Sequence, residues 1–276
     1  MKTAIATIIL VFLLMTLFFA GCKSQKSRIG FISMAGYSLA DSDGYENIVF
    51  GVPQTSADTV LHRIGYSAGY NYELRLSVWV SYYTCLDWID NKAIIGRNFR
   101  SDPDLPVDFR AYDSDYRKSG YDRGHLAKQA DMRGRSELCE REACYMSNVA
   151  PQLPNCNRVL WKRLEDEIVD YIEMNGDCWV ITGPIFFDNE YETIGDNRIP
   201  IPDAFYKVML DTLDNGLLAY AFIMPNHGSD LPIDSFAVSI DSIETVAAID
   251  LFAELPDEIE TLLEKQVNFP SEGVIQ

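Results

Sequence analysis

Residues 119–128 read Ser-Gly-Tyr-Asp-Arg-Gly-His-Leu-Ala-Lys, and residues 147–165 read Ser-Asn-Val-Ala-Pro-Gln-Leu-Pro-Asn-Cys-Asn-Arg-Val-Leu-Trp-Lys-Arg-Leu-Glu. In the first stretch Asp122, Arg123 and Gly124 place a carboxylate, a permanent cation and a flexible joint directly before His125, a titratable base. This set suits a general base that works beside an anionic substrate. A lone histidine is more often structural, and His62 and His227, which lack such neighbours, are interpreted in that way.

The second stretch is a Pro-rich loop with several amides that leads into a helix. Such loops are usually turns and caps, but neutral amide oxygens also suit Mg²⁺, which keeps most of its waters and needs few protein ligands. Glu165 follows Asn157 by eight residues, so on a helix their Cα atoms would lie about 12 Å apart. We therefore expect Glu165 to hold the metal's waters rather than the ion itself, the alternative being a solvated helix carboxylate.

Outward from these stretches, segments rich in Val, Ile, Tyr and Trp are predicted strands. They are Leu74–Tyr83, Cys178–Thr182, Tyr206–Leu213 and Leu217–Met224, the last two joined by a hairpin at Asp214-Asn215-Gly216. Helices are predicted from about Arg158 to Asn175, capped by Asn155 or Asn157 and stopped by Gly176, over Ile243–Leu255, and from Pro256-Asp257 through Lys265. Irregular alternation of the elements predicts an α+β fold with a central, largely antiparallel sheet flanked by helices.

The charge of the chain is unevenly distributed. The 276 residues carry 23 Lys and Arg against 41 Asp and Glu, a net charge of −18, and the 47% hydrophobic content excludes wholesale disorder. Such acidity argues at first against a nucleic-acid partner. However, residues 92–163 carry 14 basic and 10 acidic side chains, whereas residues 164–276 carry 3 and 24. Phosphate binding therefore remains open in the middle of the chain, with weak ground-state affinity expected from the acidic remainder.

The N-terminus is predicted to be a targeting signal. Lys2 precedes an uncharged apolar run from Ala4 to Phe19, which fits a secretory signal, although a retained membrane helix must also be considered. The sequence Phe-Ala-Gly-Cys at 19–22 resembles the lipobox of bacterial lipoproteins, in which the cysteine carries the lipid. We expect a signal peptide over 1–21, lipidation of Cys22, a polar tether over 22–45 and a folded domain over 46–276, anchored to a bacterial membrane on the periplasmic side or at the cell surface.

Five cysteines would remain after lipidation, so at least one thiol has no partner within the chain. They are Cys85, Cys139, Cys144, Cys156 and Cys178. Cys139 and Cys144 are close enough in sequence to bridge a loop, but five small buried residues are an equally good interpretation. Because no C-x-x-C pair occurs, a structural zinc site is not expected.

Taken together, the motifs resemble a known family. Asp122-Arg-Gly-His125, followed by Asn148-x-x-Pro-Gln152, Asn157, Trp161 and Glu165, is similar to the DNA/RNA non-specific endonucleases. Arg97-Asn-Phe-Arg-Ser-Asp102-Pro matches the family's upstream arginine segment, and the likeness extends from about Tyr45 to Leu263. The tetrapeptide alone is a weak signal, but the ordered set at family spacing is specific.

This resemblance implies a ββα-metal (His-Me finger) motif and a Mg²⁺-dependent nuclease, with Mn²⁺ as a substitute ion, that cuts DNA and RNA to 5′-phosphate products. His125 then matches the general base, Asn157 the direct metal ligand, Glu165 the carboxylate that organises the metal's waters, and Arg97 the arginine that stabilises the transition state. Arg123, Asn148 and Asp122 match supporting positions. Two departures are Lys128, where the family often has Pro, and Val169, where some members carry a basic group.

Two other functions remain as alternatives. One is a lipoprotein that binds nucleic acid or a partner on the same fold without cutting it, which the presence of the base, the metal ligand, the helix carboxylate and the upstream arginine disfavours. The other is a phosphodiesterase for small substrates, which keeps the chemistry and changes the pocket. No sequence feature identifies an oligomeric interface.

Overall fold

The computed structural model describes residues 32–33, 46–89, 92, 95–188, 190–213 and 216–269, all within one unit, 31–276. The predicted signal peptide over 1–21, Cys22 and most of the predicted tether over 22–45 lie outside the described residues. Within the tether range Ile32–Ser33 is described, and it forms β1, a short strand paired with the central sheet. None of the helices in the described part of the chain combines the length and apolarity of a membrane span.

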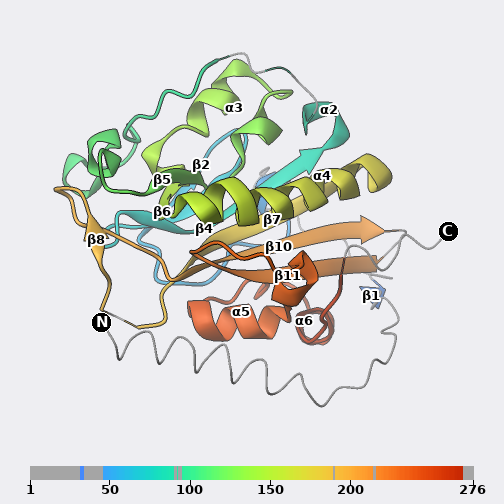
Figure 1. Ribbon diagram of the computed structural model, residues 1–276. Coiled ribbons are helices and arrows are strands. Elements are labelled where there is room, and N and C mark those ends of the chain that lie inside the picture. Colours follow the sequence, from blue (N-terminus) through green and yellow to red (C-terminus); the bar gives the residue numbers. More distant parts are fainter. Residues whose placement is uncertain are drawn as a thin grey trace. The chain divides into compact units, whose positions relative to one another are not determined.

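An antiparallel sheet forms the centre of the fold (Figure 1). Its strands run in the order β1–β11–β10–β7–β4–β3–β2, with β12 paired to β11 beside this path. Each neighbouring pair is antiparallel. The bounds are β2 Thr59–His62, β3 Ser67–Asn71, β4 Leu76–Cys85, β7 Asp177–Ile185, β10 Ala204–Leu213, β11 Gly216–Pro225 and β12 Ala237–Val238.

The four predicted strands are confirmed as β4, β7, β10 and β11. All ten residues of β11 are buried, which explains its continuous apolar sequence, because a strand covered on both faces needs no alternation of polar and apolar side chains. β10 and β11 pair in direct register down to Leu213 opposite Gly216, so the predicted hairpin is also confirmed. Its loop residues, Asp214 and Asn215, lie outside the described residues.

Helices cover both faces of the sheet. Figure 1 shows α2 (Leu86–Ile89), α3 (Glu137–Glu142) and α4 (Lys162–Asn175) over one face, and α5 (Ile240–Ala247) and α6 (Asp257–Glu264) over the other. α4 packs through an apolar stripe at helical spacing, formed by Leu164, Ile168, Tyr171 and Ile172. The predicted α+β class is therefore observed, with the sheet as the middle layer.

Several shorter elements connect these layers. β5 (Asp122–His125) and β6 (Val149–Gln152) form a two-stranded antiparallel ribbon on the same side of the sheet as α4 (Figure 1). β8 (Thr193–Ile194) pairs with β9 (Ile199–Pro200). Single 3₁₀ turns are η1 Glu46–Ile48, η2 Val107–Phe109, η3 Asp113–Tyr116, η4 Gln129–Met132, η5 Met146–Asn148 and η7 Ile233–Phe236. The β5–β6 ribbon followed by α4 has the ββα order that the motifs predicted.

The long helix begins differently from the prediction. Cys156–Trp161 forms a π-helical segment, η6, which runs directly into α4. The predicted caps were wrong, because Asn155 already has helical angles (φ −71°, ψ −31°) and Asn157 lies inside the π segment. The side chain of Asn157 instead donates to Asp122, which is remote in sequence. The predicted stop is confirmed at Gly176, whose φ of 105° suits a residue without a Cβ atom.

The helix predicted over Ile243–Leu255 was wrong at both ends. α5 starts at Ile240 because the side chain of Ser239 accepts from the N–H of Ser242, and it stops before Ala248, which is left-handed at φ 50°. Asp250 then exchanges two backbone hydrogen bonds with Gln54, at 2.8 and 2.9 Å, so a remote segment takes the chain out of the helix. The helix predicted after Pro256 is confirmed as α6.

The five described cysteines are all free thiols. Cys139, Cys144, Cys156 and Cys178 are buried, and Cys85 is partly exposed. The loop bridge between Cys139 and Cys144 is therefore absent, and the alternative of small buried side chains describes these residues. Burial raises the pKa of the Cys156 thiol to about 12, which keeps it protonated and inert at neutral pH.

Candidate active site

A cavity of about 350 Å³ opens between the end of β5, the π segment and the start of α4. It brings together five of the predicted site residues, His125, Arg97, Arg123, Asn157 and Glu165. Half of its twelve lining residues are basic, namely Arg97, Arg123, Lys128, Arg133, Arg158 and Lys162, against two carboxylates. The cavity is therefore cationic in a protein whose net charge is −18.

One cluster of acidic residues lies away from the cavity. Five carboxylates lie close together on and between α5 and α6, which cover the opposite face of the sheet (Figure 1); they are Asp241, Glu244, Asp250, Glu260 and Glu264. Burial, together with repulsion from the neighbouring carboxylates, raises the pKa of Glu264. This acidic cluster is thus separated from the cavity by the sheet, and among the residues that line the cavity arginine and lysine outnumber the carboxylates.

His125 lines the cavity and has a ring nitrogen without a hydrogen-bond partner in the described residues. This nitrogen, Nε2, is buried. The ring lies 5.1 Å from the ring of Phe99, centroid to centroid. Burial, together with the nearby charge of Arg97, lowers the pKa of His125 from 6.5 to about 3. The imidazole therefore stays neutral at physiological pH, which a proton acceptor requires.

The position before His125 must be glycine for reasons of space. A Cβ atom on Gly124 would lie 2.1 Å from Oε1 of Gln152, which is fully buried beneath the ribbon. Gly124 has no positive φ, so the flexible joint expected from the sequence is not its role. Close packing of β5 against Gln152 of β6 instead sets the position of the histidine.

Asp122 holds the first turn of the helix against β5. Its carboxylate accepts from Nδ2 of Asn157 at 3.0 Å and from Nε and Nη2 of Arg158 at 2.7 and 2.6 Å. Although burial opposes ionisation, these bonds lower the pKa of Asp122. Since an ionised carboxylate only accepts, the amide nitrogen of Asn157 must face it. Oδ1 of Asn157 is then left for a ligand in the cavity.

Arg97 and Arg123 differ in what they are free to do. The guanidinium of Arg123 is committed to Asp113, with Nε 2.6 Å from Oδ1, and also lies over the rings of Phe99 and Tyr116. Arg97 lines both the cavity and an adjoining groove of about 430 Å³ with Arg100 and Arg141. Arg123 is therefore built into the wall, whereas Arg97 can reach an anionic group.

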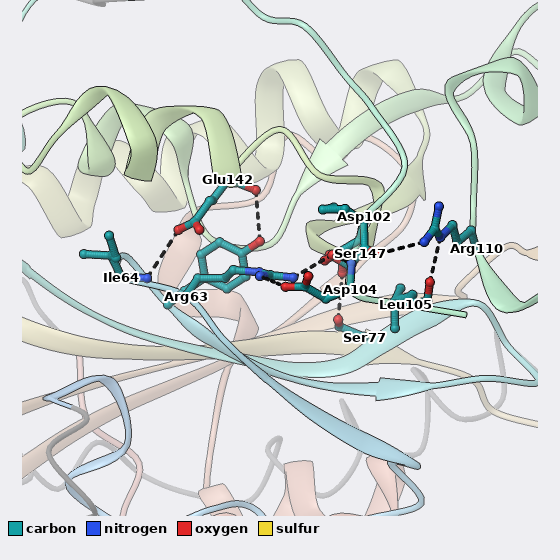
Figure 2. Close-up of polar contacts among 11 residues, drawn as sticks. Arg63, Ile64, Ser77, Asp102, Asp104, Leu105, Arg110, Glu142 and Ser147 are labelled. Carbon is teal, nitrogen blue, oxygen red and sulfur yellow. Dashed lines mark hydrogen bonds and ion pairs between the residues drawn. The ribbon is translucent and has the colours of Figure 1, made fainter. Parts of the chain in front are cut away.

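The segment that carries Arg97 is anchored by a buried ion pair at its far end (Figure 2). Arg63 donates to Oδ1 of Asp102 at 2.6 Å and also pairs with Asp104. The second oxygen of Asp102 accepts from Ser147 Oγ at 2.6 Å, and Ser77 Oγ donates to the carbonyl of Ser147 at 2.7 Å. The network joins the arginine segment to β4 and to the turn before β6, the strand that pairs with β5.

Replacing Arg63 with methionine is expected to destabilise the protein by about 3–5 kcal/mol, because it leaves the fully buried Asp102 carboxylate without its cation. Urea unfolding at pH 7 measures this loss. The double variant Arg63→Met/Asp102→Asn, which removes both charges, should recover much of it. A loss below about 1 kcal/mol in the single variant would contradict the anchoring role.

Asn148 does not reach the cavity. It is fully buried, its Oδ1 accepts from the N–H of Ala127 at 2.8 Å, and its Nδ2 donates to the carbonyls of Ala127 and Ala143, each at 2.9 Å. It thus fixes the chain just after His125. Lys128 does line the cavity, with its Nζ 3.6 Å from Asp131.

Sequence reasoning missed several residues of the site. Arg133, Arg158 and Lys162 line the cavity, and Phe99 packs on the histidine. The position of Arg158 directly after Asn157 is the sequence feature that could have identified it as a residue of the site. His62 and His227 lie outside the cavity, near Ser67 and Gly228 respectively, in agreement with their structural interpretation.

The donor set fits a hard divalent cation. Asn157 offers a neutral oxygen and Glu165, whose side chain is 14% exposed, offers a carboxylate at the same cavity. Groups of three or more clustered metal-ligating His, Cys, Asp or Glu occur in the described residues only on and between α5 and α6, so the cavity has no all-protein cage. Few protein ligands and room for waters are typical of a Mg²⁺ site and unsuited to structural zinc.

Comparisons with known proteins agree with this geometry. Residues 43–258 match the model of the DNA/RNA non-specific endonuclease family. The chain is 34% identical over 218 residues to a nuclease of Syncephalastrum racemosum, covering 71% of this chain and 68% of that protein. It is 34% identical over 164 residues to mitochondrial endonuclease G of Homo sapiens, covering 55% of each.

A solved structure extends the likeness to three dimensions. A chain in the crystal structure of the EndoG/EndoGI complex matches with a TM-score of 0.70 and 27% identity, covering 86% of this chain and 96% of that one. Fold and site together define a nuclease built on a ββα-metal motif. The chain belongs to the DNA/RNA non-specific endonuclease family, whose members depend on a divalent metal ion.

Proposed function

We propose that this endonuclease is Mg²⁺-dependent, with Mn²⁺ as a substitute, and hydrolyses both DNA and RNA to products with 5′ phosphates. One observation carries the proposal. His125, whose buried Nε2 has no partner in the described residues, and Asn157, whose Oδ1 is available, line one basic cavity. A neutral base beside a cation site and surrounded by arginines suits in-line attack of water on a phosphodiester.

In this mechanism Nε2 of His125 takes a proton from the attacking water as the new P–O bond forms. The bond from phosphorus to the 3′ oxygen breaks, so the phosphate remains on the 5′ oxygen of the downstream fragment, and the released 3′ oxygen takes up a proton from solvent to become a hydroxyl. Arg97 lines both the cavity and the adjoining groove and has no ion pair in the described residues. It stabilises the additional negative charge that develops on the phosphoryl group. Lys128 and Arg158 contribute to the positive field that attracts the backbone.

Asn157 would hold the metal ion through Oδ1, and Glu165 would organise its waters. When bound, Mg²⁺ neutralises charge that develops during hydrolysis. Asp122 orients Asn157 by accepting from its amide nitrogen. Asn148 and Arg123 position the backbone and side wall around His125. The roles of Asn148 and Arg123 are supporting ones, because the side chains of both residues are held by other protein groups and are not free to contact the reacting phosphate.

Comparison of three substrates tests the proposal. Purified protein with Mg²⁺ should degrade supercoiled plasmid and RNA at comparable rates, and a small phosphodiester far more slowly. Binding of nucleic acid without cleavage would instead identify a non-cutting lipoprotein, and preferred hydrolysis of the small diester would identify a phosphodiesterase. EDTA should abolish cleavage, and ligation of the products should require no added 5′ phosphate.

We further propose that the protein is exported and anchored to a bacterial membrane through a lipid on Cys22, with 1–21 removed, 22–45 as the tether and 46–276 as the nuclease domain. The sequence Phe-Ala-Gly-Cys at 19–22 supports it. In expressing bacteria the protein should incorporate labelled palmitate and partition with membranes, and Cys22→Ala should abolish the label. Labelling of the Cys22→Ala variant would refute lipidation at this residue.

A further inference from the structure

Lys207 is a buried cation directly behind the cavity. It lies on β10, paired across the sheet with Thr182 and Phe222, and its side chain is 0% exposed. Its Nζ lies 3.6 Å from Oε1 of Glu165 and 4.2 Å from the ring centroid of Trp161. No atom in the described residues forms a hydrogen bond with Nζ.

Stability does not explain this charge. Lysine is almost never fully buried unless it is paired, and a well-packed apolar residue is often as stable as a buried ion pair. Burial lowers the pKa of Lys207, the Glu165 carboxylate opposes that shift, Lys128 adds to it and Asp131 opposes it. The flat face of Trp161 and the carboxylate of Glu165 are the features that favour an ammonium here.

The geometry restricts what Lys207 can do. Since it has no exposed surface, it cannot contact a nucleic acid in the cavity. Glu165 both lines the cavity and contacts Lys207 through Oε1, so Oε2 is the oxygen left for the cavity. Glu165 lies only one turn into α4, and within the described part of the chain its carboxylate has Lys207 as its ion-pair partner and accepts no hydrogen bond. The ammonium is therefore the group that can hold its orientation.

We propose that Lys207 is a positioning residue of the nuclease, whose buried ammonium holds the Glu165 carboxylate turned toward the metal's waters. The inference rests on the role proposed above for Glu165. The direction of the change in metal affinity distinguishes this positioning role from a simple effect of charge. A fixed positive charge near the site would repel a divalent ion, so its removal alone should strengthen metal binding, whereas loss of a positioning group should weaken it.

The test uses Lys207→Met, Glu165→Gln and the double variant, with Lys207→Gln as a second neutral replacement and the exposed Lys265→Met as the matched control. Thermal unfolding first establishes that each variant is folded at the assay temperature. Mn²⁺ affinity is then measured by electron paramagnetic resonance on metal-free protein without nucleic acid, and kcat and KM are measured on plasmid with Mg²⁺.

Lys207→Met is expected to weaken Mn²⁺ binding about tenfold and lower kcat about 10–100-fold with KM unchanged. In the Glu165→Gln background it should cause no further loss, because its effect passes through that carboxylate. Lys265→Met should match the wild type. Tighter Mn²⁺ binding, a raised KM with unchanged kcat, or additive losses in the double variant would each overturn the proposal.

Failure of the proposed nuclease activity and failure of the positioning role of Lys207 give different results. If the wild type shows no Mg²⁺-dependent cleavage, the proposed function fails before any variant is compared. If the wild type cleaves and both neutral variants of Lys207 are folded with unchanged kcat and Mn²⁺ affinity, only the positioning role fails. Because Mn²⁺ affinity is measured without substrate, a defect confined to nucleic-acid binding cannot mimic the expected result.

Discussion

Replacing His125 with alanine is expected to lower Mg²⁺-dependent plasmid cleavage by about 10³-fold or more, because no other neutral base lines the described cavity. Since burial and Arg97 lower its pKa to about 3, the wild-type kcat/KM should not fall between pH 8 and pH 6 through protonation of this group. Its base form is lost only as the pH falls through that lowered value. Single-turnover cleavage across this pH range measures both expectations.

Two controls make the His125 result specific. His227→Ala removes an exposed histidine outside the cavity and should leave the rate unchanged. Added imidazole should partly restore cleavage by His125→Ala, because the deletion leaves space for it beside Phe99 and Arg97. Undiminished cleavage by His125→Ala would refute its role as the base, and with it the proposed mechanism.

Replacing Asn157 with alanine is expected to weaken Mg²⁺ binding by at least about 100-fold and to lower cleavage at low Mg²⁺ by a similar factor. The variant loses the oxygen proposed as the metal ligand. Its fold should change little, by about 1 kcal/mol, because it loses one hydrogen bond to Asp122 while Arg158 still pairs with that carboxylate. Isothermal titration with Mg²⁺ and thermal unfolding separate the two effects.

Asn157→Asp is the matched control for this change. It keeps an oxygen for the metal but replaces the amide donor with a second acceptor facing Asp122, so its metal binding should exceed that of Asn157→Ala while its carboxylate is less well oriented. An unchanged Mg²⁺ titration in Asn157→Ala would contradict the ligand assignment. A collapse in unfolding temperature would show that the residue acts mainly through packing.

Much of the site was predictable because its chemistry is concentrated in two short stretches. Asp122 to His125 form one strand, and Asn157 to Glu165 form the start of one helix, so local sequence places them in order. The long sheet strands were also predictable, because buried strands are apolar along their whole length. The ends of the helices were less predictable, because tertiary contacts such as the backbone hydrogen bonds between Asp250 and Gln54 override the local preference for helix.

The electrostatic character of the site required three dimensions. Net charge argued against a polyanionic substrate, and the basic excess in 92–163 only weakened that argument. The structure shows how a protein with a net negative charge can still have a basic site, since the cationic cavity and the acidic α5–α6 face lie on opposite sides of the sheet. Separation of charge by a protein layer depends on how the chain folds, and summed composition carries no information about it.

Residue types and spacing therefore specified the class of fold, the family and the groups that do the chemistry, because these groups occur in short motifs whose members lie within a few residues of one another. Tertiary structure decided which of them are free. It committed Arg123 to Asp113, buried Asn148 behind the histidine loop, turned the Asn157 oxygen away from Asp122 and put Lys207 beneath Glu165. These contacts join segments up to 42 residues apart, and packing alone brings such segments together.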